Sequence, residues 1–263
     1  MSYFHTLGHL RISQFPCLSD NYGYLVHAPA SGACAAIDTP DADAINAALA
    51  ERGWHLTDIF NTHWHPDHTG GNLALKERWG CAITGPAAED GRIPGATRLV
   101  GDGDTVRLGE RGATVLDTPG HTSGHIVYHF AGDGVAFVGD TLFALGCGRL
   151  FEGTPAQMWT SLGRIRALPE ETVVFCAHEY TQANARFAET IESGNEALAR
   201  RIGEIDAERA AGLPTVPTTI ALERDTNPFL RADAPALQSA IGMEGADPVA
   251  VFAEVRQRKD NFR

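Results

Sequence analysis

Residues 62–68 read Thr62-His63-Trp64-His65-Pro66-Asp67-His68, a spacing that indicates a metal site. Neutral imidazoles and carboxylates are the donors that borderline divalent ions prefer near pH 7. The tight turn that Pro66 implies lets the donor side chains point in different directions. His63 and His65 can then serve one ion while Asp67 and His68 serve a second, because one tetrahedral centre can hardly take all four.

Three more candidate ligands follow apolar runs that are typical of strands. His121, Asp140 and His178 each stand at the end of such a run, as His63 does. If these strands share a sheet, the loops after them converge along one edge, where binding sites usually lie.

Together the seven donors predict a pair of metal sites. One site takes His63, His65 and His121, the other takes Asp67, His68 and His178, and Asp140 can bridge the two through its two oxygens. Ions held about 3.5–4 Å apart share a water and lower its pKa, so the predicted reaction class is hydrolysis by a bridging hydroxide. Asp67 and Asp140 are the candidate catalytic residues, which orient the hydroxide and take its proton. The expected cofactors are two divalent ions per chain: zinc, with iron or manganese as alternatives.

Two other residues have a possible link to these ligands. Asp38 closes a predicted strand and can hold the distal N–H of a ligand imidazole, although an ordinary turn aspartate fits equally well. His125 stands four residues after His121, and we expect it to pack against the ligands or support them.

Apolar runs without regular helix alternation predict an α/β fold of the α+β kind, with mixed sheets and helices packed outside. The predicted strands are Ile12–Leu18, Tyr22–Ala28, Ala33–Ile37, Asp58–Asn61, Thr114–Asp117, His125–Phe130, Val135–Val138 and Thr172–Ala177. The predicted helices of this part are Asp41–Arg52, Gly70–Trp79 and Pro155–Leu168.

The composition changes after Tyr180, where few β-branched runs remain. Helices are predicted at Thr181–Ile191, Asn195–Ala211 and Pro248–Lys259, and the proline-containing stretch Leu213–Pro228 is predicted to be a long irregular connection. The expected domains are therefore a catalytic domain at 1–180 and a helical domain at 181–263.

The charge and the cysteines limit the class of protein. The 263 residues carry a net charge of -12, which argues against a nucleic-acid or anionic-membrane binder. We expect no targeting segment and no membrane span, because the chain shows no apolar run of sufficient length. The five scattered cysteines indicate reduced, buried thiols in a cytoplasmic protein.

The histidine motifs resemble those of the metallo-β-lactamase superfamily. The matching segments are Thr62–Gly71, Thr118-Pro119-Gly120-His121-Thr122 and Gly139-Asp140. The resemblance implies a four-layer αββα sandwich with its metals at one edge. The superfamily hosts many chemistries, so it does not identify the reaction.

Further segments are similar to the glyoxalase II, or hydroxyacylglutathione hydrolase, family over essentially the whole chain. They are Leu18–Tyr22, Gly139–Phe143, Gly146–Thr154, His178–Thr181, Asn227–Arg231 and Arg256–Asp260. This resemblance implies a C-terminal helical domain and hydrolysis of S-D-lactoylglutathione to glutathione and D-lactate, in methylglyoxal detoxification. The implied substrate contacts are Arg149, Phe151, Tyr180, Asn184, Arg256 and Lys259.

The charge of the C-terminal segment agrees with such a substrate. Glutathione carries two carboxylates, and residues 251–263 hold four basic and two acidic side chains. Arg256 and Lys259 are spaced i, i+3, so they share a helix face. Where some relatives have Lys and Tyr, this chain has Arg149 and Phe151, which keeps the charge and loses a hydroxyl.

The expected partner is a small glutathione thioester, with no nucleic acid, no membrane and no obligate protein partner. A thiol with a pKa near 8.5 leaves a tetrahedral intermediate without much protonation, so no dedicated general acid is expected. The alternatives are a glutathione persulfide dioxygenase with a single iron, a lactonase or β-lactamase of the same superfamily, and a metal-binding protein without catalysis. A nuclease fits the net charge least well.

Overall fold

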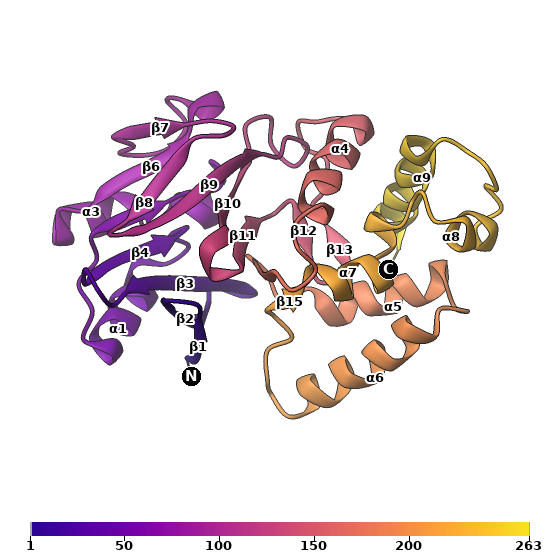
Figure 1. Cartoon of the computed structure of the whole chain (residues 1–263), viewed down its shortest axis with the longest axis horizontal. Coiled ribbons are helices and arrows are strands. Elements are labelled where there is room, and N and C mark those ends of the chain that lie inside the picture. The colour runs from indigo at the N-terminus through magenta and orange to yellow at the C-terminus, as the bar shows by residue number, and fades with distance from the viewer. Residues whose placement is uncertain (1, 263) are drawn as a thin grey trace. The chain divides into compact units, whose positions relative to one another are not determined.

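The computed structural model describes residues 2–262, which divide into two units (Figure 1). The first unit comprises the chain up to Asp117 together with Thr122–Gly139. The second comprises Thr118–His121 and the chain from Asp140 onwards. The predicted domain boundary at 180 falls inside the second unit. The units group residues that pack together, whereas the predicted boundary marks a change in composition along the chain.

Two sheets form the first unit. The larger is seven-stranded in the order β1-β2-β3-β4-β5-β6-β7, and four strands of the other follow in the order β11-β10-β9-β8. The strands of the larger sheet are β1 (Tyr3–Leu7), β2 (Leu10–Cys17), β3 (Asn21–Ala28), β4 (Ala33–Ile37), β5 (Asp58–Phe60), β6 (Ala82–Pro86) and β7 (Arg98–Val100). Those of the other sheet are β8 (Thr105–Leu108), β9 (Arg111–Asp117), β10 (Ile126–Phe130) and β11 (Val135–Gly139).

Aromatic rings fill the space between these sheets. Tyr24 packs on Phe137 at 5.7 Å between ring centroids, and Phe60 packs on Tyr128 at 5.4 Å. The outer face of the larger sheet is covered by α1 (Ala42–Arg52) and α3 (Asn72–Trp79), which contribute Leu49 and Leu75 to the core. Because both faces are covered, β4 and the end of β5 are buried almost throughout.

The parallel strands β4 and β5 position the histidine segment. Their register pairs Ile37 with Phe60, and the Asp38 N–H donates to the Phe60 carbonyl at 3.0 Å. Parallel strands end at the same edge of a sheet, so Asp38 and the segment after Phe60 leave that edge together. The short helix α2 (Pro66–Thr69) then begins with Pro66 at its first position, as proline prefers.

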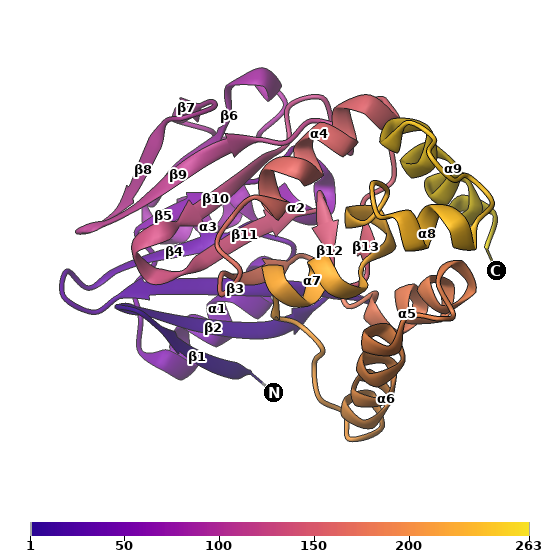
Figure 2. The ribbon, with the colours of Figure 1, turned by 45° about the vertical axis from the view of Figure 1, so that its right-hand side comes forward.

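Helices make up most of the second unit. They are α4 (Pro155–Arg166), α5 (Thr181–Ile191), α6 (Glu196–Ala210), α7 (Ile220–Thr226), α8 (Pro235–Ala240) and α9 (Pro248–Asn261). The strands are β12 (Leu142–Phe143), β13 (Gly146–Cys147), β14 (Val173–Cys176) and β15 (Thr218–Thr219). Figure 2 shows α5 followed by α6, and the short β12–β13 hairpin close to α7.

The prediction of an irregular connection over Leu213–Pro228 was wrong. This stretch contains β15, which pairs with β14, and the whole of α7. The side chain of Thr219 caps α7 by accepting a hydrogen bond from the Leu222 N–H at 3.3 Å. The prolines lie outside the helix, at 214, 217 and 228, so they do not interrupt it.

Two sequence expectations concern burial and membranes. The five cysteines are free and buried, as predicted. Among the helices of residues 2–262, none combines the length and the apolar character needed to cross a bilayer.

Candidate metal centre

Asp38 fixes the ring of His68. Its Oδ2 atom lies 2.8 Å from His68 Nδ1, and both side chains are buried. A carboxylate accepts only, so His68 donates its Nδ1–H and presents the lone pair of Nε2. The predicted hydrogen bond from the imidazole of a candidate ligand to Asp38 is therefore present.

The same carboxylate fixes His63 through Thr62. The Thr62 hydroxyl donates to Asp38 Oδ2 at 2.8 Å and lies 3.0 Å from His63 Nδ1. Because its proton is given to Asp38, the hydroxyl accepts from His63 Nδ1–H, and His63 presents Nε2 as a lone pair. Sequence reasoning missed Thr62, since nothing in the spacing distinguishes a hydroxyl that relays a contact from any other threonine.

The remaining donors of the first unit, His65 and Asp67, face the Nε2 atoms of His63 and His68. His65 Nδ1 lies 3.0 Å from His63 Nε2, so the two rings converge on a common point. Asp67 Oδ2 lies 3.5 Å from His68 Nε2 and accepts from the Asn21 amide at 3.2 Å. The predicted set His63, His65, Asp67 and His68 is thus gathered at one edge of the larger sheet.

Glycine is required close to these rings. Gly139 has φ 48°, and a Cβ there would lie 2.6 Å from both His125 Nε2 and the Thr62 hydroxyl. His125 itself is buried and stacks on His63 at 4.8 Å between ring centroids. Its predicted packing against the candidate ligands is confirmed.

The other three predicted ligands lie together in the second unit. Asp140 Oδ2 is 3.4 Å from His121 Nε2, and Asp140 Oδ1 is 3.4 Å from His178 Nε2. All three side chains are buried. The two oxygens of one carboxylate therefore face two different imidazoles, which is the arrangement that bridging requires.

A backbone carbonyl fixes the ring of His121. The carbonyl oxygen of Arg149 lies 3.0 Å from His121 Nδ1. A carbonyl accepts only, so His121 donates Nδ1–H and presents the Nε2 lone pair towards Asp140. The family resemblance implies a substrate contact for Arg149, whereas this role of its backbone carbonyl follows only from the fold.

Two predicted substrate contacts pack on these histidines. Phe151 is 59% exposed and meets the His121 ring edge-on at 5.2 Å. Tyr180 stacks on His178 at 4.8 Å with an interplanar angle of 1°. Both rings thus stand beside a candidate ligand and retain exposed surface.

Two of the predicted cationic contacts, Arg256 and Lys259, lie on α9, whereas Arg149 follows β13. Lys259 is half-buried, its Nζ lies over the Phe187 ring at 5.1 Å, and it donates to the Ala183 carbonyl. This burial lowers the pKa of Lys259 to about 8, and repulsion from Arg256, Arg186 and Arg149 adds to the effect. Arg186 was absent from the predicted contacts, although it follows Asn184 by two residues on α5.

Arg256 and Asn184 are buried and engaged within the second unit. Arg256 donates to Asp260 Oδ1 at 2.7 Å and to the Cys147 carbonyl at 3.1 Å. The Asn184 amide donates to the Ala144 carbonyl at 3.1 Å. Both residues hold the β12–β13 hairpin, and their contact with substrate stays a prediction.

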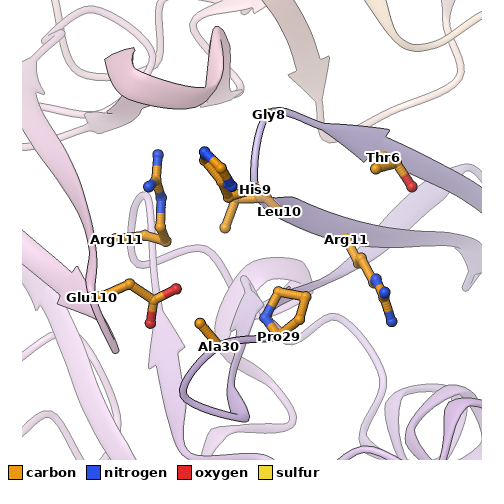
Figure 3. A pocket seen from close by; sticks show the side chains of 9 residues that line it. All are labelled: Thr6, Gly8, His9, Leu10, Arg11, Pro29, Ala30, Glu110 and Arg111. Atoms are coloured by element: carbon orange, nitrogen blue, oxygen red, sulfur yellow. The ribbon is translucent and has the colours of Figure 1, made fainter.

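A separate hollow of about 420 Å³ lies in the first unit (Figure 3). It is lined by the turns that precede β2, β4 and β9, whereas Asp38 follows the end of β4, so the hollow lies at the opposite end of these strands from the candidate ligands of the first unit. Of its two arginines, Arg111 is paired with Asp133 at 2.9 Å. Its lining also includes Glu110, which opposes Arg11 in charge, so the hollow offers no convergent charge for a ligand.

Comparisons with known proteins match both parts of the chain. The model of the metallo-beta-lactamase superfamily matches residues 30–178, and the model described as hydroxyacylglutathione hydrolase C-terminus matches residues 179–262. The hydroxyacylglutathione hydrolase of Maricaulis maris is 56% identical over 97% of this chain and 100% of its own length. That of Hyphomonas neptunium is 56% identical over 96% of this chain and 98% of its own length.

The fold also resembles that of solved structures. The crystal structure of ETHE1 from Myxococcus xanthus superimposes with a TM-score of 0.65 at 28% identity, covering 96% of this chain and 99% of that one. Mixed sheets with external helices, followed by a helical C-terminal part, are therefore the fold that was predicted.

Proposed function

The chain belongs to the hydroxyacylglutathione hydrolase family of the metallo-beta-lactamase superfamily, and from this premise we infer that it hydrolyses S-D-lactoylglutathione to glutathione and D-lactate. Relatives that share more than half of its residues over nearly their full length carry this name. The high sequence identity to relatives with this name favours thioester hydrolysis over the persulfide dioxygenase and lactonase alternatives.

The donor set suits a pair of divalent ions, and zinc is the proposed occupant. The supporting observation is the orientation of three imidazoles: His63, His68 and His121 each give Nδ1–H to a fixed acceptor and present Nε2. Buried imidazoles and carboxylates are the ligands of borderline divalent ions, and iron or manganese fits the same donors.

We assign the donors in two sets. One ion would be held by His63, His65 and His121, the other by Asp67, His68 and His178, with Asp140 shared by both. Family membership and donor chemistry support this assignment. When bound, the ions would supply a water of lowered pKa and a Lewis acid for the thioester carbonyl.

Two carboxylates of the chain would then orient that water and accept its proton. The carboxylates of Asp67 and Asp140 are the acceptors, since Asn21 holds Asp67 Oδ2 and Asp140 lies between two imidazoles. Glutathione leaves as a thiolate, so the reaction needs no side chain as general acid.

The substrate is proposed to lie against Phe151 and Tyr180, with its carboxylates near the cations of α9. Arg149, Arg186 and Arg256 all raise the local positive potential at Lys259, which supports an anionic ligand there. Asn184 belongs to the proposed contact set through the family resemblance. In this proposal residues 1–180 carry the chemistry and contribute Arg149, Phe151 and Tyr180 to the substrate site, and residues 181–263 add the remaining substrate contacts.

A cytoplasmic location completes the proposal. Glutathione thioesters form where glutathione is abundant, and thiols persist in reducing compartments. The five free, buried cysteines agree with such a compartment.

The proposal is tested by metal analysis combined with thiol release from S-D-lactoylglutathione. Two ions per chain and thiol release above the uncatalysed rate are expected. Asp140→Ala should lose metal and activity together, because its carboxylate faces two candidate ligands. Oxygen consumption with glutathione persulfide by a protein with one iron, without thiol release, would overturn the proposal.

A further inference from the structure

The segment Asp140–Arg149 connects two groups that face the same histidine. Asp140 Oδ2 lies 3.4 Å from His121 Nε2, and the Arg149 carbonyl lies 3.0 Å from His121 Nδ1. Between them the chain folds back so closely that a Cβ on Gly148 would lie 2.0 Å from the Asp140 carbonyl oxygen. The position of one end of this segment therefore constrains the other.

The tip of the segment is the β12–β13 hairpin, and side chains from later helices hold its backbone. The Asn227 amide donates to the carbonyls of Phe143 and Gly146 at 3.1 and 3.0 Å. Leu145, which has φ 58°, donates its N–H to Glu223 Oε2 at 2.9 Å. The hairpin carbonyls of Ala144 and Cys147 accept from Asn184 and Arg256.

Glu223 is the centre of this network. It is completely buried, and its Oε2 also accepts from the Asn227 amide at 2.8 Å. Its Oε1 accepts from Thr218 at 2.7 Å and from Arg201, with which it forms a buried ion pair. Both oxygens of Glu223 are thus engaged, and its negative charge is matched by one guanidinium.

These contacts hold the backbone of a sheet that has two short strands. Such hairpins are marginal by themselves, and a non-glycine residue in the left-handed region needs its surroundings to keep it there. The Leu145 conformation is consistent with a hairpin shaped by Glu223 and Asn227 rather than by its own sequence.

We propose that Glu223 and Asn227 are positioning residues for the metal centre: they hold the hairpin so that Asp140 and the Arg149 carbonyl fix His121. This inference rests on the proposed function, since it takes Asp140 and His121 as metal ligands. The helices after residue 180 then complete the metal centre in addition to binding substrate.

The test compares metal affinity in three full-length variants. Glu223→Gln removes the charge that pairs with Arg201, and Asn227→Ser removes the donors to the hairpin while a serine still caps Pro228–Leu230. Glu192→Gln is the matched control, because Glu192 is a buried carboxylate paired with Arg231 at 2.7 Å in the same unit.

Co²⁺ is titrated into each metal-free protein against a chelator, and its absorption spectrum reports the ligand geometry. Glu223→Gln and Asn227→Ser should bind at least one Co²⁺ more weakly, by up to the 10- to 100-fold that follows the loss of a group bonded directly to a ligand, because they act on the ligand through the hairpin. Excess Co²⁺ should restore their kcat, with KM little changed. Glu192→Gln should match the wild type in Co²⁺ affinity and spectrum, even where its melting temperature falls equally.

Two results would overturn the inference or its basis. If Glu223→Gln and Asn227→Ser bind Co²⁺ as tightly as the wild type and Glu192→Gln, the hairpin contacts do not position the ligands. If Glu223→Gln does not fold, Asn227→Ser gives the same comparison. A wild-type protein that binds fewer than two ions would instead contradict the proposed function itself.

Discussion

One carboxylate orients two imidazoles that are assigned to different ions: Asp38 Oδ2 lies 2.8 Å from His68 Nδ1. The same oxygen accepts from the Thr62 hydroxyl at 2.8 Å, and Thr62 holds His63. Asp38 reaches both while its backbone adopts the left-handed conformation, with φ 56°. Its charge is therefore expected to affect a donor of each of the two assigned sets.

The substitution Asp38→Asn tests that expectation. Asparagine tolerates the left-handed region, so the substitution removes the charge with little backbone strain. One side of the new amide would present N–H groups to a neighbouring donor, and metal affinity should fall about 10- to 100-fold. Asp41→Asn is the control, because Asn caps α1 as well as Asp does. Equal metal affinity in the two variants would contradict the role of Asp38.

The lowered pKa of Lys259 predicts a pH-dependent affinity. Its pKa of about 8 means that the ammonium is charged below this pH and neutral above it. If it binds a glutathione carboxylate, KM should rise above pH 8, by up to about tenfold for each pH unit. Lys259→Arg should remove this rise, since Arg stays charged. Steady-state kinetics across this range distinguish the two, and identical KM profiles would exclude Lys259 from binding.

The variants Arg256→Ala and Lys259→Ala should differ in their effects on KM and on stability. Lys259 donates to a backbone carbonyl on α5 and is the proposed contact of a glutathione carboxylate. Because it would bind the substrate without taking part in the chemistry, its loss should raise KM with little change in kcat. Arg256 is buried and holds both Asp260 and the Cys147 carbonyl, so its loss should also destabilise the protein by about 2 kcal/mol. Kinetics and thermal unfolding of both variants measure the difference. A pure KM effect in Arg256→Ala would show that its hairpin contact is dispensable.

Gly139→Ala should be strongly destabilising. Left-handed strain adds to a clash with His125 and Thr62, and together they should lower stability by about 3 kcal/mol and the melting temperature by about 5–10 °C. Gly134→Ala is the matched control just before the same strand, since φ is 67° there and no described atom lies within 4 Å of the added Cβ. It should cost about 1 kcal/mol. Equal melting temperatures in the two variants would show that the space around Gly139 is not limiting.

The sequence predicted those parts of the fold in which local signals and burial agree. Asp41 caps α1 and Thr154 caps α4 with Pro155 at its first turn, so both helices begin where their caps predict. The segment containing α7 was mispredicted, because its prolines suggested a loop while a single threonine cap and the pairing with β14 decide the outcome. That pairing joins distant residues, and spacing along the chain does not show it.

The site divides in a similar way. Metal donors have distinctive residue types at strand ends, so His63 and Asp140 could be recognised from the sequence alone. The groups that orient them could not, because Thr62 and Glu223 are ordinary residues until the fold brings them to a candidate ligand or to the hairpin. Asn21 is a further example. It lies in the family-like segment Leu18–Tyr22, but its hydrogen bond to Asp67 joins two elements and cannot be read from the sequence.

The acceptor that holds His121 is a main-chain oxygen, and this separates two properties of position 149. Any amino acid placed there offers the same oxygen to the imidazole, while its side chain stays exposed. If the Arg149 side chain contacts the substrate as proposed, substitutions at this position would alter substrate affinity without removing the acceptor of the imidazole.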